Sequence, residues 1–190
     1  RWIEPKLIFT CALSDFFHRE ADPWREAAWS IMRSTSHTYQ ILTKRPGLMV
    51  AWAKKHGWLE NVWAGTSVES TKYLPRLDVL ARVPAKVRFI SAEPLLDSLD
   101  LEPWLGRYDR PALRSIYWAI VGGESGPKAR PMNLDWVRGI IQACQYAGVP
   151  CFVKQLGTAW AKTVKGADYH GGRMEFWPED LRVREWPRSL

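Results

Sequence analysis

Short apolar runs alternate along the chain with longer segments whose apolar residues recur every three or four positions. The continuous runs predict buried β-strands over residues 6–13, 38–45, 61–69, 86–96, 115–125 and 150–157. Helical spacing between them predicts helices over residues 22–36, 46–57, 70–83 and 133–148. Repeated strand–helix alternation indicates a parallel α/β sheet, and both an open doubly wound sheet and a closed or partial barrel fit it.

Turn and capping residues mark several helix ends. Asp22 is expected to cap the helix over 22–36, with Pro23 in its first turn. Gly57 is expected to end the helix over 46–57. Asn133 and Gly148 are expected to cap the two ends of the helix over 133–148.

The chain reads as one folding unit followed by a polar extension. Residues 1–157 are expected to form the barrel-like core, and residues 158–190, which are rich in charge and glycine, a C-terminal extension that packs on it. The proline-containing stretch 97–114 reads as a loop, with a short helix expected near 102–105. The chain starts with Arg1, so we expect it to be a piece of a longer protein.

Composition favours a protein with a polyanionic partner and argues against a membrane or secreted protein. The net charge of +7 favours polyanionic partners such as a nucleic acid or nucleotide. No run approaches the roughly 18 apolar residues of a membrane span, and no signal peptide is visible, so we expect a cytoplasmic protein of a bacterium or a phage-infected host. Cys11, Cys144 and Cys151 are expected to be reduced thiols packed in the core, because their spacing does not match a metal site.

Polar groups close every predicted strand. In a parallel sheet these ends share one rim, where α/β proteins bind their ligands. The rim would gather both signs of charge and two adjacent glycines, from Asp15, Lys44, Ser67, Glu69, Glu93, Gly122, Gly123, Glu124, Lys154 and Gln155. Such a pocket suits a zwitterionic or polyhydroxylated ligand, and glycines let a ligand approach the backbone. Strands that simply become polar as they reach solvent are the plainer interpretation.

Individual rim residues have plainer roles as well. Glu69 could cap the helix that starts near Ser70, and Glu93 could shape the loop at Pro94. The segment "GPKARP" could bring Arg130 to a phosphate or carboxylate, or it could be a solvated loop.

Seven motifs occur in a fixed order over nearly the whole chain: "LSDFFH", "ILTKRP", "VWAGTSVE", "RFISAEPLL", "WAIVGGESGPKARPM", "FVKQLG" and "WPEDLRVREWP". In this set the chain resembles the phage-associated gp-thirty-seven/sixty-eight family of uncharacterised proteins, which are divergent relatives of radical S-adenosylmethionine enzymes. The resemblance implies a partial parallel (βα)6-type barrel, completed by a strand that precedes this chain.

The resemblance also implies cofactors: S-adenosylmethionine and a four-iron, four-sulfur cluster. The three clustered cysteines that would hold the cluster precede the first strand in the family and are not present in this chain, which is therefore expected to be inactive alone. The resemblance places Ser67, Glu69, Glu93, Gly122, Gly123 and Glu124 at the cofactor, and Asp15, Lys44, Arg130, Lys154 and Gln155 on the substrate side.

Three functions therefore compete. The first is the core of a radical S-adenosylmethionine-type enzyme that acts on a nucleic-acid base or nucleotide. The second is a non-catalytic nucleic-acid-binding protein, whose C-terminal Trp177, Arg182, Arg184 and Trp186 would stack on and pair with single strands. The third is another barrel enzyme that uses the rim carboxylates.

Overall fold

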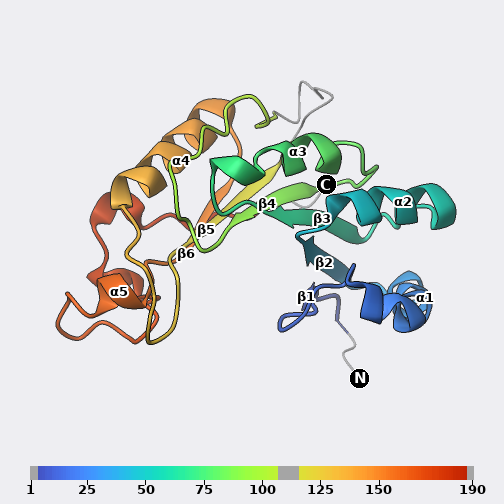
Figure 1. Cartoon of the computed structure of the whole chain (residues 1–190), viewed down its shortest axis with the longest axis horizontal. Coiled ribbons are helices and arrows are strands. Elements are labelled where there is room, and N and C mark those ends of the chain that lie inside the picture. Colours follow the sequence, from blue (N-terminus) through green and yellow to red (C-terminus); the bar gives the residue numbers. More distant parts are fainter. Residues whose placement is uncertain (1–3, 107–115, 188–190) are drawn as a thin grey trace.

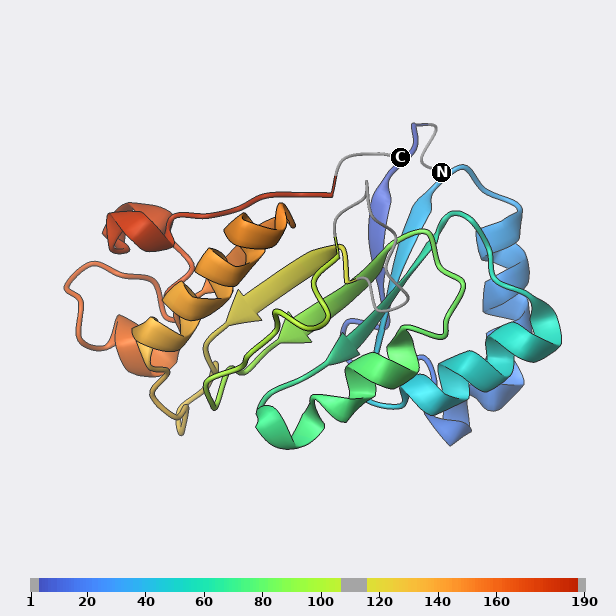
Figure 2. The same ribbon diagram turned by 90° about the horizontal axis from the view of Figure 1, so that it is seen from above.

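The computed structural model describes residues 4–106 and 116–187, and within these ranges six strands form one parallel sheet in the order of the sequence. The sheet curls into a half-barrel (Figures 1 and 2). Its strands are β1 Leu7–Thr10, β2 Thr38–Thr43, β3 Val62–Ser67, β4 Arg88–Ala92, β5 Trp118–Gly122 and β6 Cys151–Gln155. The predicted partial (βα)6-type barrel is confirmed. A doubly wound sheet is excluded because the strand order never reverses.

The helices follow the strands as the periodicity predicts, and they lie on the outer side of the curled sheet (Figure 2). The α-helices are α1 Asp22–Arg33, α2 Pro46–His56, α3 Pro75–Leu80, α4 Leu134–Ala147 and α5 Thr158–Ala161. Short 3-10 turns occupy Arg19–Ala21, Thr71–Tyr73, Met174–Phe176 and Glu179–Leu181. Sequential parallel strands with right-handed connections place every crossover on the same face, which leaves the inner face of the sheet free of helices.

Three of the four predicted helix-end residues are confirmed. Asn133 caps α4 by accepting a hydrogen bond from the backbone N–H of Asp135, and Gly148 ends it in the left-handed conformation. Gly57 ends α2 at a φ of 74°. The predicted cap at Asp22 is wrong: this residue lies inside α1 and pairs with Arg25 at 2.6 Å.

The loop after β4 also differs from its prediction. Residues 102–104 form a turn rather than a helix, and Leu105 makes an isolated parallel bridge to Ile116. The rest of this predicted loop, from 107 on, lies outside the described residues.

The central strands of the sheet, such as β4 and β5, are buried on both faces, which explains their continuous apolar runs, whereas the edge strand β1 is largely exposed. On the outer face, residues such as Ile41, Val62 and Val121 join the helices in the main core. On the inner face, a separate aromatic floor lines the half-barrel, made of Phe89, Trp118 and Ile120 with Leu42, Trp63 and Phe152 packed against them. Gly65 of β3 is part of this arrangement, because a Cβ there would lie inside the ring of Phe89.

The C-terminal segment runs along the outer edge of β6. Arg184 forms an antiparallel bridge with Phe152, and the backbone N–H of Glu185 donates to the carbonyl oxygen of Cys151 at 2.8 Å. Trp186 packs on the rings of Trp118 and Phe152, at centroid distances of 5.0 and 4.9 Å. The extension therefore covers one edge of the sheet and attaches to the aromatic floor.

Candidate functional site

The rim formed by the carboxyl ends of the strands carries a row of ion pairs. The first is built around Glu69, just beyond β3, whose side chain is only 7% exposed. Its carboxylate pairs with Lys44, which follows β2, and with Arg76 of α3 at 3.1 Å. Arg76 also donates to the carbonyl oxygen of Ser67 at 2.7 Å, which fixes the guanidinium beside the strand end. Glu69 is therefore an ion-paired group on the rim and does not cap a helix.

A second pair joins the ends of β4 and β6. The ammonium of Lys154 lies 3.1 Å from the carboxylate of Glu93, which also accepts a hydrogen bond from the Ser91 hydroxyl at 3.2 Å. Gly122 at the end of β5 makes room for this carboxylate, since a Cβ there would lie 2.6 Å from its Oε1 atom. Residues from three neighbouring strands thus meet at Glu93.

A third pair lies beyond β5. Glu124 accepts hydrogen bonds from the backbone N–H of Arg130 at 2.8 Å and from its guanidinium at 2.7 Å on each carboxylate oxygen. These bonds lower the pKa of Glu124 to about 2. Glu124 therefore stays ionised throughout the physiological range and holds the 126–130 turn against the strand end.

We expect the carboxyl resonance of Glu124, followed by NMR during acid titration, to show a midpoint near the value of about 2. In Arg130→Ala the midpoint should return toward the ordinary 4.5. Because the folded pKa is depressed, the ion pair contributes stability above the unfolded pKa and loses that contribution as the pH falls from 4.5 to about 2. An unchanged midpoint in Arg130→Ala would contradict this assignment.

Other atoms of the protein occupy the space beside the rim glycines. A Cβ at Gly123 would lie 2.8 Å from the backbone nitrogen of Gly157, in the loop after β6. Gln155 ties the same loop to β5, because its amide donates to the carbonyl oxygen of Gly123 at 3.0 Å and to the hydroxyl of Ser125 at 2.6 Å. Gly122 and Gly123 therefore serve close packing of strand ends.

Asp15 anchors the other end of the rim. It accepts hydrogen bonds from the hydroxyl of Thr43 at 2.7 Å and from the backbone N–H of Phe17 at 2.9 Å, and it pairs with Arg45 at 2.6 Å. Burial alone would raise the pKa of Asp15, but these bonds and one from the Lys44 N–H together lower it. The ionised carboxylate fixes the loops after β1 and β2 against each other.

A hollow of about 390 Å³ opens beside these loops, within the size range of ligand pockets. Both charged and apolar side chains line it: Phe9, Cys11, Ala12, Leu13, Ser14, Asp15, Leu42, Thr43, Lys44, Arg45 and Ser67. Cys11 is exposed here, so its predicted place in the core is wrong; β1 is the edge strand and ends at Thr10. Its φ of 57° lies in the left-handed region, which few residues other than glycine adopt.

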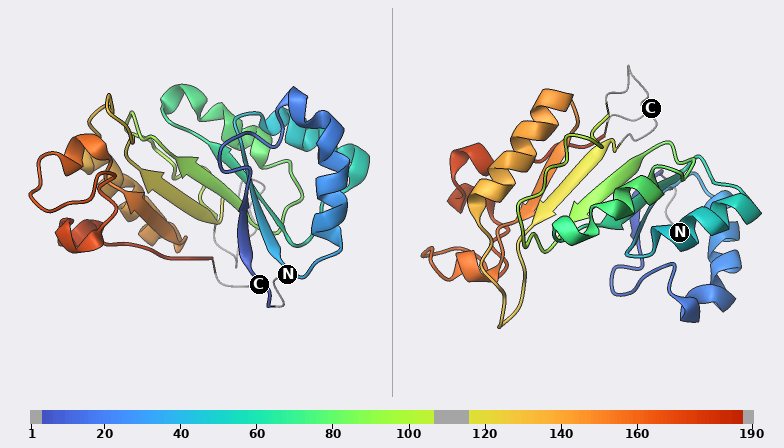
Figure 3. Two further views of the ribbon diagram at one scale, coloured as in Figure 1. Left: turned by 90° about the horizontal axis from the view of Figure 1, so that it is seen from below. Right: turned by 45° about the horizontal axis from the view of Figure 1, so that its top comes forward.

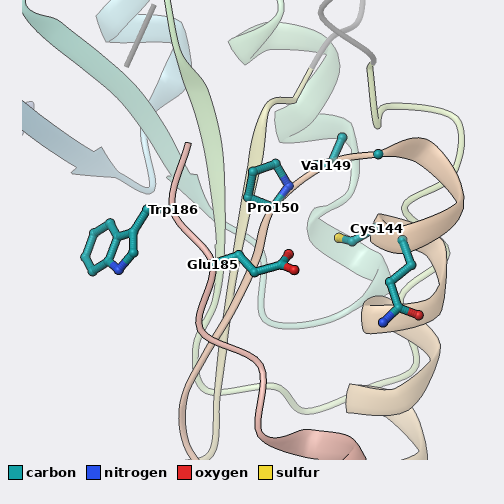
Figure 4. Close-up of a pocket in the computed structure, with 7 residues that line it drawn as sticks. Cys144, Val149, Pro150, Glu185 and Trp186 are labelled. Atoms are coloured by element: carbon teal, nitrogen blue, oxygen red, sulfur yellow. The ribbon is translucent and has the colours of Figure 1, made fainter. Parts of the chain in front are cut away.

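A second hollow, of about 620 Å³, lies at the amino end of β6, away from the rim (Figure 4). Figure 4 shows the Glu185 carboxylate turned toward α4 and the Trp186 ring turned the other way. Cys144 and Cys151 are buried here, as predicted. A hydrogen bond with Cys144, burial and the nearby Glu185 carboxylate all raise the pKa of Cys151, so this thiol stays neutral and unreactive.

Three of the C-terminal residues expected to contact single strands, Trp177, Arg182 and Arg184, donate hydrogen bonds to backbone carbonyl oxygens of the chain, and Trp186 is 51% exposed. Trp177 is buried and donates its indole N–H to the carbonyl oxygen of Gly171 at 2.9 Å. The guanidinium of Arg182 donates to the carbonyl oxygen of Trp177 at 2.9 Å, and that of Arg184 donates to the carbonyl oxygen of Lys154 at 2.8 Å. These side chains hold the extension in place.

The structure thus brings the predicted rim residues to one end of the sheet, but in separate pairs. Glu69 pairs with Lys44 and Glu93 pairs with Lys154, whereas Glu124 pairs with Arg130. Arg76 was not predicted, because nothing in a helical repeat distinguishes a cation that turns back to the rim. Across residues 4–106 and 116–187, no group of three His, Cys, Asp or Glu side chains could hold a metal ion.

Comparisons with known proteins give one match. Residues 1–178 match the model of a family described as a protein of unknown function (DUF5131). No curated protein and no solved structure matches the chain. Of the helices that the structure describes, none is long and apolar enough to cross a membrane.

Proposed function

The chain belongs to the DUF5131 family, and from this premise we propose that its rim binds S-adenosylmethionine, as the barrel core of a radical S-adenosylmethionine-type enzyme. The family description names no activity, so the support for the proposal comes from the chemistry of the rim. That support is the presence of two carboxylate–lysine pairs at adjacent strand ends.

Both pairs have the charges and the exposure that allow them to exchange partners with a zwitterionic ligand. The carboxylates of Glu69 and Glu93 are largely shielded, whereas the side chains of Lys44 and Lys154 are 57% and 54% exposed. A ligand ammonium can take the place of a lysine on its carboxylate, and the released lysine can pair with the ligand carboxylate. S-adenosylmethionine carries an amino group, a carboxylate and a sulfonium, and its ribose hydroxyls suit a hydroxyl partner such as Ser67, which lines the 390 Å³ hollow.

The described residues do not fit an iron–sulfur cluster. A cluster needs several thiolates around one point. Cys11 is exposed beyond the carboxyl end of β1, whereas Cys144 and Cys151 are buried at the amino end of β6, on the opposite edge of the sheet. We therefore derive no reaction step through a cluster, and the proposal for this chain is restricted to binding of the cofactor.

Calorimetric titration of the chain with S-adenosylmethionine tests the proposal. We expect saturable binding, and we expect Glu93→Gln to weaken it about tenfold or more, since a charge-assisted hydrogen bond contributes about 1.5–3 kcal/mol. The matched control is Glu26→Gln on α1, an exposed carboxylate far from the rim, which should bind like the unmodified chain.

Two results would overturn the proposal. One is the lack of saturable heat with millimolar S-adenosylmethionine. The other is equal affinity of Glu93→Gln and Glu26→Gln for the cofactor, which would show that the cofactor does not bind at the rim. Circular dichroism of both variants shows whether each is folded.

A further inference from the structure

Beside the Glu93–Lys154 end of the rim, three segments that carry exposed cations lie against one another and are here called the α5 face. The backbone N–H of Thr158 donates to the carbonyl oxygen of Glu124 at 2.9 Å, and the N–H of Gly126 donates to the Thr158 hydroxyl at 3.1 Å. The N–H of Gly157 donates to the carbonyl oxygen of His170 at 3.0 Å. The turn at 126–130, helix α5 and the turn at 168–171 are therefore fixed to one another.

Cations project from each side of this surface. Lys128 and Arg130 come from the first turn, and Lys162 and Lys165 come from the end of α5 and the loop after it; all four are exposed. Lys162 reaches the carbonyl oxygen of Pro127 at 3.3 Å, which brings α5 and the first turn side by side. Figures 1 and 3 show α5 and the loop after it at the opposite end of the molecule from α1 and α2.

The carboxylates near the α5 face are already occupied. Glu124 is held by Arg130. Asp168 accepts backbone N–H groups from Gly172 and Arg173, at 2.8 Å each, and these bonds outweigh its burial and lower its pKa. Glu175 pairs with Arg173. The lysines of the face are therefore left to meet an external anion.

The α5 face also presents aromatic rings. Tyr169 is 52% exposed, although it lies in a well-anchored turn. Its ring meets that of His170 edge to face, with centroids 5.1 Å apart. Exposed aromatic rings among cations are the combination that binds single-stranded nucleic acids, because phosphates meet the cations and unpaired bases stack on the rings.

We propose that the α5 face, through Lys128, Lys162, Lys165, Tyr169 and His170, binds single-stranded nucleic acid, while Arg130 stays paired with Glu124. The turn at 168–171 hydrogen-bonds to the loop after β6 and Gln155 contacts Ser125, so a strand on this face would lie next to Lys154 and Glu93. The further assignment of that strand as the substrate of the rim rests on the function proposed above, whereas binding to the face does not.

The test measures fluorescence anisotropy of a labelled thymidine oligonucleotide of about 20 nucleotides at low salt. We expect the double variant Lys128→Glu/Lys165→Glu to bind about tenfold or more weakly. The slope of its log affinity against log salt concentration should be shallower by about 1.4, which corresponds to the loss of two single-strand phosphate contacts. The matched control is Lys54→Glu/Lys55→Glu at the end of α2, which changes the net charge equally and should alter affinity by less than about twofold.

Aromatic stacking is tested separately. Tyr169→Ala should weaken binding by about fivefold or more, and Tyr169→Phe, which keeps the ring, should restore most of the affinity. The affinity for a uridine oligonucleotide of equal length shows whether RNA is preferred. The affinity for a duplex of equal length shows whether the face requires single-stranded nucleic acid.

Three outcomes would overturn the proposal: no binding at low salt, equal losses for the two charge-reversal variants, or tighter binding of the duplex. Titration of Lys128→Glu/Lys165→Glu with S-adenosylmethionine keeps the two proposals apart. Unchanged cofactor affinity with lost oligonucleotide binding supports the α5 face, whether or not the strand is a substrate.

Discussion

Replacement of Trp118 by alanine is expected to destabilise the protein by about 3–5 kcal/mol, the range for a large aromatic residue lost from a core. Trp118 of β5 is 1% exposed and lies at the centre of the aromatic floor. Its indole N–H donates to the carbonyl oxygen of Glu185 at 2.9 Å, so the change also releases the C-terminal segment. Urea unfolding followed by circular dichroism measures the loss.

The control is Trp24→Ala on α1. Trp24 is 72% exposed, and removal of its ring should change the free energy of unfolding by no more than about 0.5 kcal/mol. If the two variants are equally stable, the aromatic floor does not hold the half-barrel together. If Trp118→Ala does not fold, the milder Trp118→Phe should fold with an intermediate loss.

Replacement of Arg76 by alanine is expected to have the second largest effect, about 2–3 kcal/mol. The carboxylate of Glu69 is shielded from water, and the change removes one of its two cations and leaves Lys44 alone. A buried charge that loses a partner is strongly destabilising, because its desolvation is no longer offset. The same change removes the hydrogen bond to the carbonyl oxygen of Ser67.

Arg173→Ala provides the comparison. Arg173 pairs with Glu175 at 2.5 Å, but both side chains are more than half exposed, and such surface pairs contribute about 0–1 kcal/mol. Equal losses in the two variants would show that Glu69 is not an energetically special group. The double variant Arg76→Ala/Glu69→Gln should recover part of the loss, since the uncompensated charge is then removed.

The arrangement of strands and the polar rim could be predicted because two simple constraints act on them. Strands such as β4 and β5 are covered on both faces, so each must be a continuous apolar run. Parallel strands all point the same way, so the polar residues after each run collect at one edge. The prediction failed at β1, where the edge position leaves Cys11 exposed.

The pairing within the rim could not be predicted. Glu69 selects Lys44 and Arg76 because the curl of the sheet and the placement of α3 bring them together, and neither depends on spacing along the chain. The role of the rim glycines could not be predicted either. Gly122 fits a ligand approaching the backbone as well as it fits the Glu93 side chain, and only the packing distinguishes them.

The last part of the C-terminal extension shows a related limit. Its alternating charges and tryptophans are typical of an exposed binding segment, yet the arginines donate to backbone carbonyl oxygens, as Arg182 does to Trp177. The single-stranded nucleic acid is proposed to contact an earlier part of the same extension, around Lys162 and Tyr169.

The sequential order of the strands also has a consequence for how the chain acquires its structure. Each strand from β2 onward pairs with the strand that precedes it, so no segment has to wait for a distant partner before it docks. Folding can therefore advance unit by unit as the chain leaves the ribosome. The last step is different: the C-terminal segment can join β5 and β6 only after both strands have formed, and it covers the outer edge of β6.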